Sequence, residues 1–136
     1  DIRLPTEWQW ERAGRGTDGR VYPWGDEYRA GQANINESWS DVGPHNLGRT
    51  TAVGIYPQGA SPEGVLDLAG NLWEWCLNEY ANPKRTQPGG TESRVLRGGS
   101  WGNSQDYARA DYRLFYHPVS RFVAHGFRVV RGSPIR

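Results

Sequence analysis

Few side chains in this chain have the types and spacing that catalysis requires. The single cysteine, Cys76, has no partner for an internal disulfide, and no cysteine–histidine spacing matches a zinc site. The three histidines, His45, His117 and His125, stand apart from any nucleophile motif, so no serine–histidine–aspartate arrangement is indicated. The residue types therefore do not favour hydrolytic or zinc-dependent chemistry.

Side chains suited to recognition are concentrated in the last third of the chain. The stretches Arg94–Trp101 and Gly126–Arg131 have the pattern of rigid strands. Between them lie three short clusters, at residues 102–104, 114–116 and 122–124, separated by spaced arginines. Tyrosine and phenylalanine offer a large contact area at small entropic cost, and serine, asparagine and aspartate add adaptable hydrogen bonds. This alternation of fixed and variable positions predicts a scaffold that displays a binding surface, with a variable region over about residues 94–131.

The candidate ligand-binding positions belong to these clusters and to the residues beside them. They are Gly102, Asn103, Ser104, Asp106, Tyr107, Leu114, Phe115, Tyr116, Phe122, Val123 and Ala124. Weaker candidates are Asp111, Tyr112, His117, Ser120 and His125. Because three consecutive displayed side chains do not follow strand alternation, we expect loops to present each cluster together. The alternative is that the apolar members, Leu114, Phe115, Phe122 and Val123, pack inside the domain.

Arginines are expected to hold these loops in place. All but one of the 16 basic residues are arginines, whose planar guanidinium groups make several hydrogen bonds at once. The expected framework consists of Arg109, Arg113, Arg121 and Arg128. Each would bind loop carbonyls or pair with an acid such as Glu74 or Asp67.

Length and composition limit the fold class and the partners. A chain of 136 residues suits one domain, and 7 Trp with 7 Tyr and no Met indicate a core built around a few large aromatic side chains. The 18 Gly and 9 Pro argue for many turns and little helix. A net charge of +1 predicts no nucleic-acid partner, and no apolar run is long enough for membrane insertion. The sequence leaves the compartment open.

The elements that must position these side chains are short. Residues 4–13 carry a helix signature, with Thr6 as the N-cap and Gln9 as its capping-box partner, and the tryptophans of this helix are expected in the core. Strands are expected at residues 65–68, 72–77, 94–97, 108–112 and 127–131. The loop-rich stretch from Gly19 to Gly64 needs an ion or aromatic anchors to hold it.

Several short sequence motifs of this chain occur together in one known protein family. In chain order they are Leu4-Pro-Thr-Glu7, Tyr22-Pro-Trp-Gly25, Asp67-Leu-Ala-Gly-Asn-Leu-Trp-Glu-Trp75, Arg97-Gly-Gly-Ser-Trp101 and Gly126-Phe-Arg128. With these motifs the chain resembles the formylglycine-generating enzyme, or sulfatase-modifying factor, family. The resemblance implies an α+β fold of the C-type lectin type, loop-rich with short antiparallel strands and few helices, in a single domain over residues 1–136. The family's N-terminal part is missing, so we expect this chain to be the C-terminal part of a longer polypeptide.

The same resemblance bears on catalysis. The paired cysteines that bind copper in the true enzymes of this family fall here on Asn103 and Ala108. Neither side chain supplies a thiolate, which a soft copper ion and the redox chemistry both require. We therefore expect no copper or iron, and no enzymatic activity.

Calcium is the cofactor that the resemblance leaves open. A calcium site of the family corresponds to Asp67, the carbonyls of Gly70 and Leu72, and Glu74. Oxygen ligands from acids and backbone suit Ca²⁺. The alternative is that Glu74 pairs with a framework arginine and that no metal binds.

Some members of this fold are the variable proteins of diversity-generating retroelements, in which adenine-directed mutagenesis randomises codons between an Arg-Gly-Gly-Ser-Trp motif and a closing Gly-Phe-Arg. This chain looks similar, and no candidate position holds Lys, Glu, Gln, Met or Trp, the residues that the mechanism excludes. The resemblance thus implies a ligand-binding module whose partner is a protein or a cell-surface ligand. One alternative is a component of a formylglycine-generating-enzyme-like or sulfoxide-synthase-like oxidase whose metal ligands lie outside this chain. Sugar binding is a further alternative, but the Glu-Pro-Asn and Gln-Pro-Asp triplets of sugar-binding lectins are absent.

Overall fold

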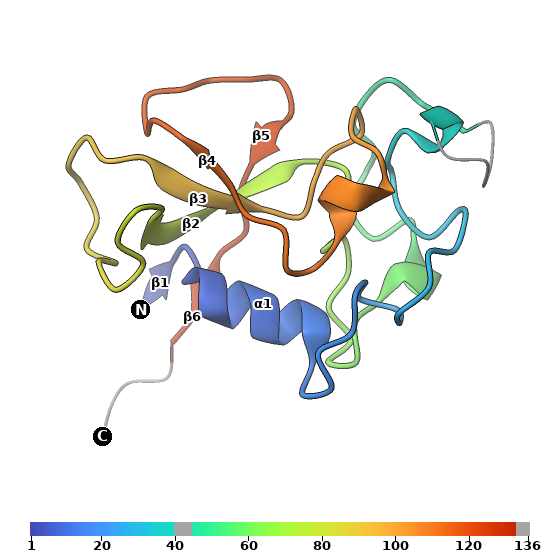
Figure 1. Cartoon of the computed structure of the whole chain (residues 1–136), viewed down its shortest axis with the longest axis horizontal. Helices are drawn as coiled ribbons and strands as arrows, with labels where there is room; N and C mark the ends of the chain where they lie inside the picture. The colour runs from blue at the N-terminus through green and yellow to red at the C-terminus, as the bar shows by residue number, and fades with distance from the viewer. Residues whose placement is uncertain (40–44, 133–136) are drawn as a thin grey trace.

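The computed structural model of the chain describes residues 1–39 and 45–132 (Figure 1). One α-helix lies within these ranges, α1 (Glu7–Arg15). The Thr6 hydroxyl accepts a hydrogen bond from the Gln9 backbone, and the Gln9 side chain accepts one from the Thr6 backbone, so the predicted capping box is confirmed. The helix ends at Gly16, whose positive φ of 61° suits glycine. No helix in the described ranges is long and apolar enough to cross a membrane.

A four-stranded sheet forms the centre of the molecule. It consists of β2 (Trp73–Glu79), β3 (Arg94–Arg97), β4 (Leu114–Tyr116) and β5 (His125–Gly126), in the spatial order β4-β3-β2-β5. Strand β3 runs antiparallel to both β4 and β2, whereas β5 runs parallel to β2. The register places Leu114 opposite Leu96 and His125 opposite Trp73. The expected strands at 72–77 and 94–97 are thus confirmed to within about two residues.

A separate two-stranded ribbon joins the two ends of the described chain. It pairs β1 (Ile2–Arg3) with β6 (Val130–Arg131), and the Gly132 N–H donates to the Asp1 carbonyl at 3.0 Å. The strand expected at residues 127–131 is therefore shorter than the sequence pattern indicates.

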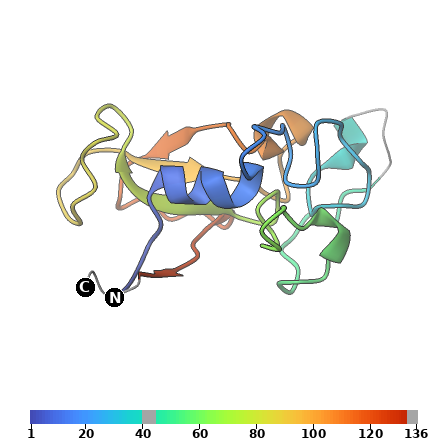
Figure 2. The same ribbon diagram turned by 90° about the horizontal axis from the view of Figure 1, so that it is seen from below.

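Helix α1 covers one face of the sheet (Figure 2). The core between them contains Trp10, Leu68, Cys76 and Val95, all buried. Each large apolar side chain buried in this way contributes about 1.5–3 kcal/mol. The expectation that both helix tryptophans lie in the core is wrong for Trp8, which is 53% exposed.

Loops and short 3₁₀-helices make up the rest of the described chain. The 3₁₀-helices are η1 (Glu37–Trp39), η2 (Pro57–Gly59) and η3 (Gln105–Ala108). In the long N-terminal loop region, the Tyr22 ring stacks on Trp24 at 5.2 Å, and Tyr28 meets Tyr22 edge-on at 5.5 Å. Aromatic anchors for this loop were one of the two expected solutions, and they are confirmed.

Two expected strands are absent from the structure, at residues 65–68 and 108–112. In the second stretch the Ala110 N–H donates to the Val21 carbonyl at 2.8 Å, and the Ala110 carbonyl accepts from Arg97 at 3.0 Å. These groups are therefore unavailable for a strand ladder. The turn after β3 brings this stretch close: Gly99 has a φ of 71°, and a Cβ there would lie 3.0 Å from the Tyr107 carbonyl oxygen.

Candidate ligand-binding surface

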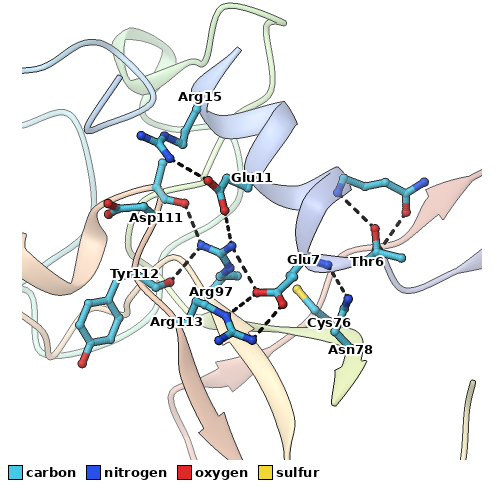
Figure 3. Close-up of polar contacts among 12 residues, drawn as sticks. Thr6, Glu7, Glu11, Arg15, Cys76, Asn78, Arg97, Asp111, Tyr112 and Arg113 are labelled. Carbon is cyan, nitrogen blue, oxygen red and sulfur yellow. Dashed lines mark hydrogen bonds and ion pairs between the residues drawn. The ribbon is translucent and has the colours of Figure 1, made fainter. Parts of the chain in front are cut away.

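A buried network of charges fixes the helix to the sheet (Figure 3). Arg97 of β3 is 1% exposed, and one terminal nitrogen of its guanidinium lies 2.5 Å from the Glu11 carboxylate and 3.4 Å from that of Glu7. The other terminal nitrogen donates to the carbonyls of Ala110 at 3.0 Å and Tyr112 at 3.3 Å. One guanidinium thus connects the helix, the sheet and the chain that leads into β4.

Arg113 completes this network next to β4. Its guanidinium donates two hydrogen bonds to the Glu7 carboxylate, at 2.7 and 2.9 Å, and lies 4.5 Å from the centre of the Tyr80 ring. The Glu7 backbone N–H donates to the Asn78 side chain at 2.7 Å. Arg113 therefore pairs with an acid, as expected of a framework arginine. That acid is Glu7 of the helix, which the sequence did not indicate as its partner.

Arg128 meets both expectations for a framework arginine. It donates to the Glu74 carboxylate at 2.6 and 2.8 Å and to the carbonyls of Leu66 and Asp67 at 3.0 Å each. The Trp10 indole N–H also donates to Glu74, at 2.6 Å. The hydrogen bonds of Arg128 thus attach the C-terminal end of the predicted variable region to β2 and to the chain that precedes it.

These contacts bear on the calcium prediction. The predicted ligands are Asp67, Gly70, Leu72 and Glu74. Both oxygens of Glu74 already accept N–H donors, and a cation there would face the Arg128 guanidinium. The Asp67 carboxylate accepts from the Gly54 N–H at 2.7 Å, and the Gly70 carbonyl accepts from the Leu72 N–H at 3.0 Å. The arrangement fits the salt-bridge alternative better than calcium, and the calcium site stays a prediction. Within residues 1–39 and 45–132, no group of three or more His, Cys, Asp and Glu side chains is placed to hold a metal ion.

The other two expected framework arginines lie at the surface. Arg109 pairs with Asp111 at 3.1 Å, and both side chains are partly exposed. Arg121 is exposed and forms no ion pair with any residue that the structure describes. The framework expected from sequence therefore reduces to Arg113 and Arg128, and Arg97 is the member that was missed.

The sheet face opposite α1 carries a set of aromatic side chains, which we name the aromatic face. Its members are Trp73, Trp75, Tyr107, Tyr112, Tyr116, Phe122 and His125. Because successive side chains of a strand point to opposite faces, the two tryptophans of β2 lie on this side, while Glu74 and Cys76 between and after them point toward the helix.

The rings of the aromatic face contact one another in two groups. The Trp73 ring lies 5.9 Å from Tyr112, which lies 5.0 Å from Tyr107. In the second group the His125 ring lies 5.5 Å from Trp75 and 4.9 Å from both Tyr116 and Phe122. Edge-to-face and tilted pairs of this kind are each worth about 0.5–1.5 kcal/mol beyond burial.

None of the eleven candidate positions is buried. The exposed ones are Asp106, Tyr107, Phe115, Tyr116, Phe122 and Val123. The half-buried ones are Gly102, Asn103, Ser104, Leu114 and Ala124. The alternative that the apolar members pack wholly inside the domain is therefore wrong, since Phe122 is 53% and Val123 is 84% exposed.

The cluster at residues 114–116 is not a loop, contrary to expectation. It forms strand β4 at the edge of the sheet, where Phe115 pairs with Val95 of β3. Alternation along the strand turns Phe115 to the helix side, and its ring packs against Tyr80 at 4.6 Å. Tyr116 instead joins the aromatic face. The structure therefore separates Phe115 from the other exposed aromatic candidates, while residues 122–124 do lie in a loop.

Asn103 has a structural role among the candidates. Its side-chain oxygen accepts from the Ser100 backbone N–H at 3.0 Å and from the Ser100 hydroxyl at 2.7 Å. Its backbone carbonyl accepts from the Asn36 N–H at 2.8 Å. Substitution at this position therefore disturbs a turn, which is less expected of a freely variable site.

Sequence reasoning did not single out Trp73 and Trp75 as part of a binding surface. The available signal was the alternation Trp73-Glu74-Trp75, which places both indoles on one side of a strand. His125, a weaker candidate, lies in the middle of the second aromatic group.

Comparison with known proteins agrees with this architecture. The family model of the sulfatase-modifying factor enzyme 1-like domain matches residues 1–133 of the chain. The chain belongs to this family. Inactive C-alpha-formylglycine-generating enzyme 2 from Mus musculus is 37% identical over 93% of this chain and 42% of its own length. Hercynine oxygenase from Mycolicibacterium thermoresistibile is 34% identical over 93% of this chain and 31% of its own length.

A solved structure shows the same fold. Treponema denticola variable protein 1 superposes on 94% of this chain with a TM-score of 0.72 and 28% identity, and the match covers 46% of that protein. The α+β, C-type lectin fold expected from the resemblance is confirmed. The chain spans less than half the length of these relatives, so their whole-protein activities do not transfer to it directly.

The two positions to which the family resemblance assigns the copper-binding cysteines, Asn103 and Ala108, carry no thiol in this chain. Asn103 holds Ser100, as described above, and Ala108 is buried without a functional group. The only thiol, Cys76, lies on the helix side of β2, and burial raises its pKa to about 12. No thiolate is therefore available near these positions.

Proposed function

We propose that this sulfatase-modifying factor domain is a non-catalytic ligand-binding module, and that it recognises a protein or cell-surface ligand through the aromatic face. The observation that carries the proposal is the separation of two functions across one sheet. Ion pairs that each have one buried partner hold the helix side, while Tyr107, Tyr116 and Phe122 are exposed on the other side. Exposed aromatic side chains on a rigid support are typical anchors of protein interfaces.

The similarity to a variable protein supports a diversified surface. Side chains at 107, 116, 122 and 123 are exposed and take no part in the ion pairs of the frame, so many residue types would fit there. A reverse-transcriptase gene next to a near-copy of the segment encoding residues 94–131, differing only at adenines, would establish this origin.

Selection of peptides tests the binding function directly. A phage-displayed random peptide library would be selected on the immobilised domain, on a double variant with Tyr116→Ser and Phe122→Ser, and on Trp8→Ser. Trp8 is an equally exposed aromatic residue on α1, on the other side of the sheet, and serves as the matched control.

We expect peptides selected on the natural domain to bind Trp8→Ser equally well and to lose binding to the double variant by tenfold or more, about 1.4 kcal/mol. A cooperative thermal unfolding transition in each variant would show that both are folded. Peptides that bind the double variant as well as the natural domain would refute recognition by the aromatic face.

A further inference from the structure

One end of the aromatic face is basic as well as apolar. From Tyr112 to Arg131 the sequence contains 4 arginines and 2 histidines, but no aspartate or glutamate. Two of these arginines, Arg113 and Arg128, are neutralised by buried acids. Arg121 is exposed, and within the described ranges no carboxylate pairs with it. Its charge is therefore free to meet a partner.

Arg121 borders a hollow next to the second aromatic group. The hollow has a volume of about 300 Å³ and is lined by Trp75, Ser120, Arg121, Phe122, His125, Gly126 and Phe127. No acidic residue is among these described lining residues. Phe122 and Phe127 are 53% and 69% exposed, so its apolar walls open to solvent. This volume is at the lower end for small-molecule sites and suits one side chain of a peptide better than a large cofactor.

We propose that this hollow binds a peptide segment of the partner that carries an apolar side chain next to an aspartate or glutamate. This inference rests on the proposed function and names the chemistry of its partner. The apolar side chain would pack between Trp75 and Phe122, and the carboxylate would take hydrogen bonds from the Arg121 guanidinium. Arginine binds carboxylates with two parallel hydrogen bonds, and it is enriched at the energetically important positions of interfaces.

Charge complementarity is the physical reason for choosing an acidic partner. An exposed arginine without a nearby acid attracts a carboxylate and repels a basic peptide. A bound peptide would exclude water from the space between the aromatic walls and so strengthen that attraction. A purely apolar partner would leave the Arg121 guanidinium partly desolvated without compensation.

The peptide selection described above tests this inference when it is extended to Arg121→Glu and Arg131→Glu. Arg131 is an exposed arginine on the β1–β6 ribbon, which makes it the matched charge control. We expect peptides from the natural domain to be enriched in Asp or Glu next to Leu, Ile or Phe. Their affinity should fall tenfold or more in Arg121→Glu and change less than about twofold in Arg131→Glu.

Selection on Arg121→Glu itself should yield peptides enriched in Lys or Arg instead. Selected peptides without acidic residues, or equal affinity for the natural domain and folded Arg121→Glu, would overturn the inference. In that case loss of binding in the Tyr116→Ser and Phe122→Ser variant would still support recognition by the aromatic face, so the two proposals fail separately.

Discussion

Cys76 illustrates how position decides the chemistry of a side chain. It is 1% exposed on the helix side of β2, and burial raises the pKa of its thiol to about 12. The reactive thiolate is therefore almost absent at neutral pH. We expect native protein at about pH 8 to resist alkylation by iodoacetamide, while denatured protein reacts fully. Rapid alkylation of the native protein would contradict the burial of Cys76 and would make a reaction at this thiol a candidate function again.

His125 predicts a pH dependence of stability. Burial lowers its pKa from the ordinary value of about 6.5. A histidine whose folded pKa lies below its unfolded pKa contributes stability that is complete above the unfolded value and is lost as the pH falls through the folded value.

We therefore expect acidification from about pH 7 to about pH 5 to lower the melting temperature of the natural domain more than that of His125→Gln. His117→Gln, at an exposed histidine, is the control and should behave like the natural domain. Equal losses in His125→Gln and the natural domain would show that protonation of His125 carries no cost.

At the scale of elements, the attachment of α1 to the sheet depends on Arg97. Removing one partner of a buried ion pair leaves an uncompensated charge and costs about 3–5 kcal/mol. We expect Arg97→Ala to lower the free energy of unfolding by up to this amount, because the buried Glu7 keeps Arg113 but loses Arg97, and two carbonyls lose their donor. Urea denaturation measures the difference.

The matched control is Arg12→Ala on the same helix. Arg12 pairs with Glu63 at 2.9 Å, but both side chains are more than half exposed, so this change should cost less than about 1 kcal/mol. Similar losses for the two variants would mean that the Arg97 network does not hold the helix.

The sequence predicted some elements well and others poorly, for identifiable reasons. Helix α1 could be recognised because its capping residues, Thr6 and Gln9, lie within one turn of each other. Strand β4 could not, because Leu114-Phe115-Tyr116 is short and its alternation is hidden: all three side chains are apolar or aromatic, although Phe115 points the other way. Only the pairing of β4 with β3, which the sequence does not reveal, shows that these residues form a strand.

Long-range contacts also limited what the sequence could predict about the candidate site. Arginines at regular spacing indicated a framework, but the pairing of Arg113 with Glu7 spans 106 residues and has no local signal. Arg121 was wrongly assigned to the framework: it has the same spacing as the framework arginines, but it lies at the surface. Residue type and spacing thus indicated the presence of a frame, and only the fold determined which arginines belong to it.

For the whole molecule, the position of Arg128 predicts independence from calcium. Its guanidinium already neutralises Glu74 and binds two carbonyls next to it. We expect the melting temperature to be the same with excess calcium and with EGTA. A rise with calcium that disappears in Glu74→Gln would instead establish the metal site that the family resemblance implied.

In the proposed function, the two sides of the sheet have different roles: the helix side is a frame and the opposite side is a display surface. The frame is formed by buried charge pairs between α1 and the strands, and the display surface by the exposed part of the aromatic face. No thiol is present at Asn103 and Ala108, where the resemblance places the catalytic pair, yet the chain has the fold of the family. In the proposed function, recognition depends on which side chains this scaffold displays.

Simultaneous randomisation of residues 107, 116, 122 and 123 on the surface of yeast, with resistance to protease as the measure of folding, tests this division most directly. A parallel library at residues 7, 11, 97 and 113 provides the comparison. We predict that most members of the first library stay protease-resistant and that almost none of the second do. Equal sensitivity of the two libraries would contradict a frame that is independent of the surface it displays.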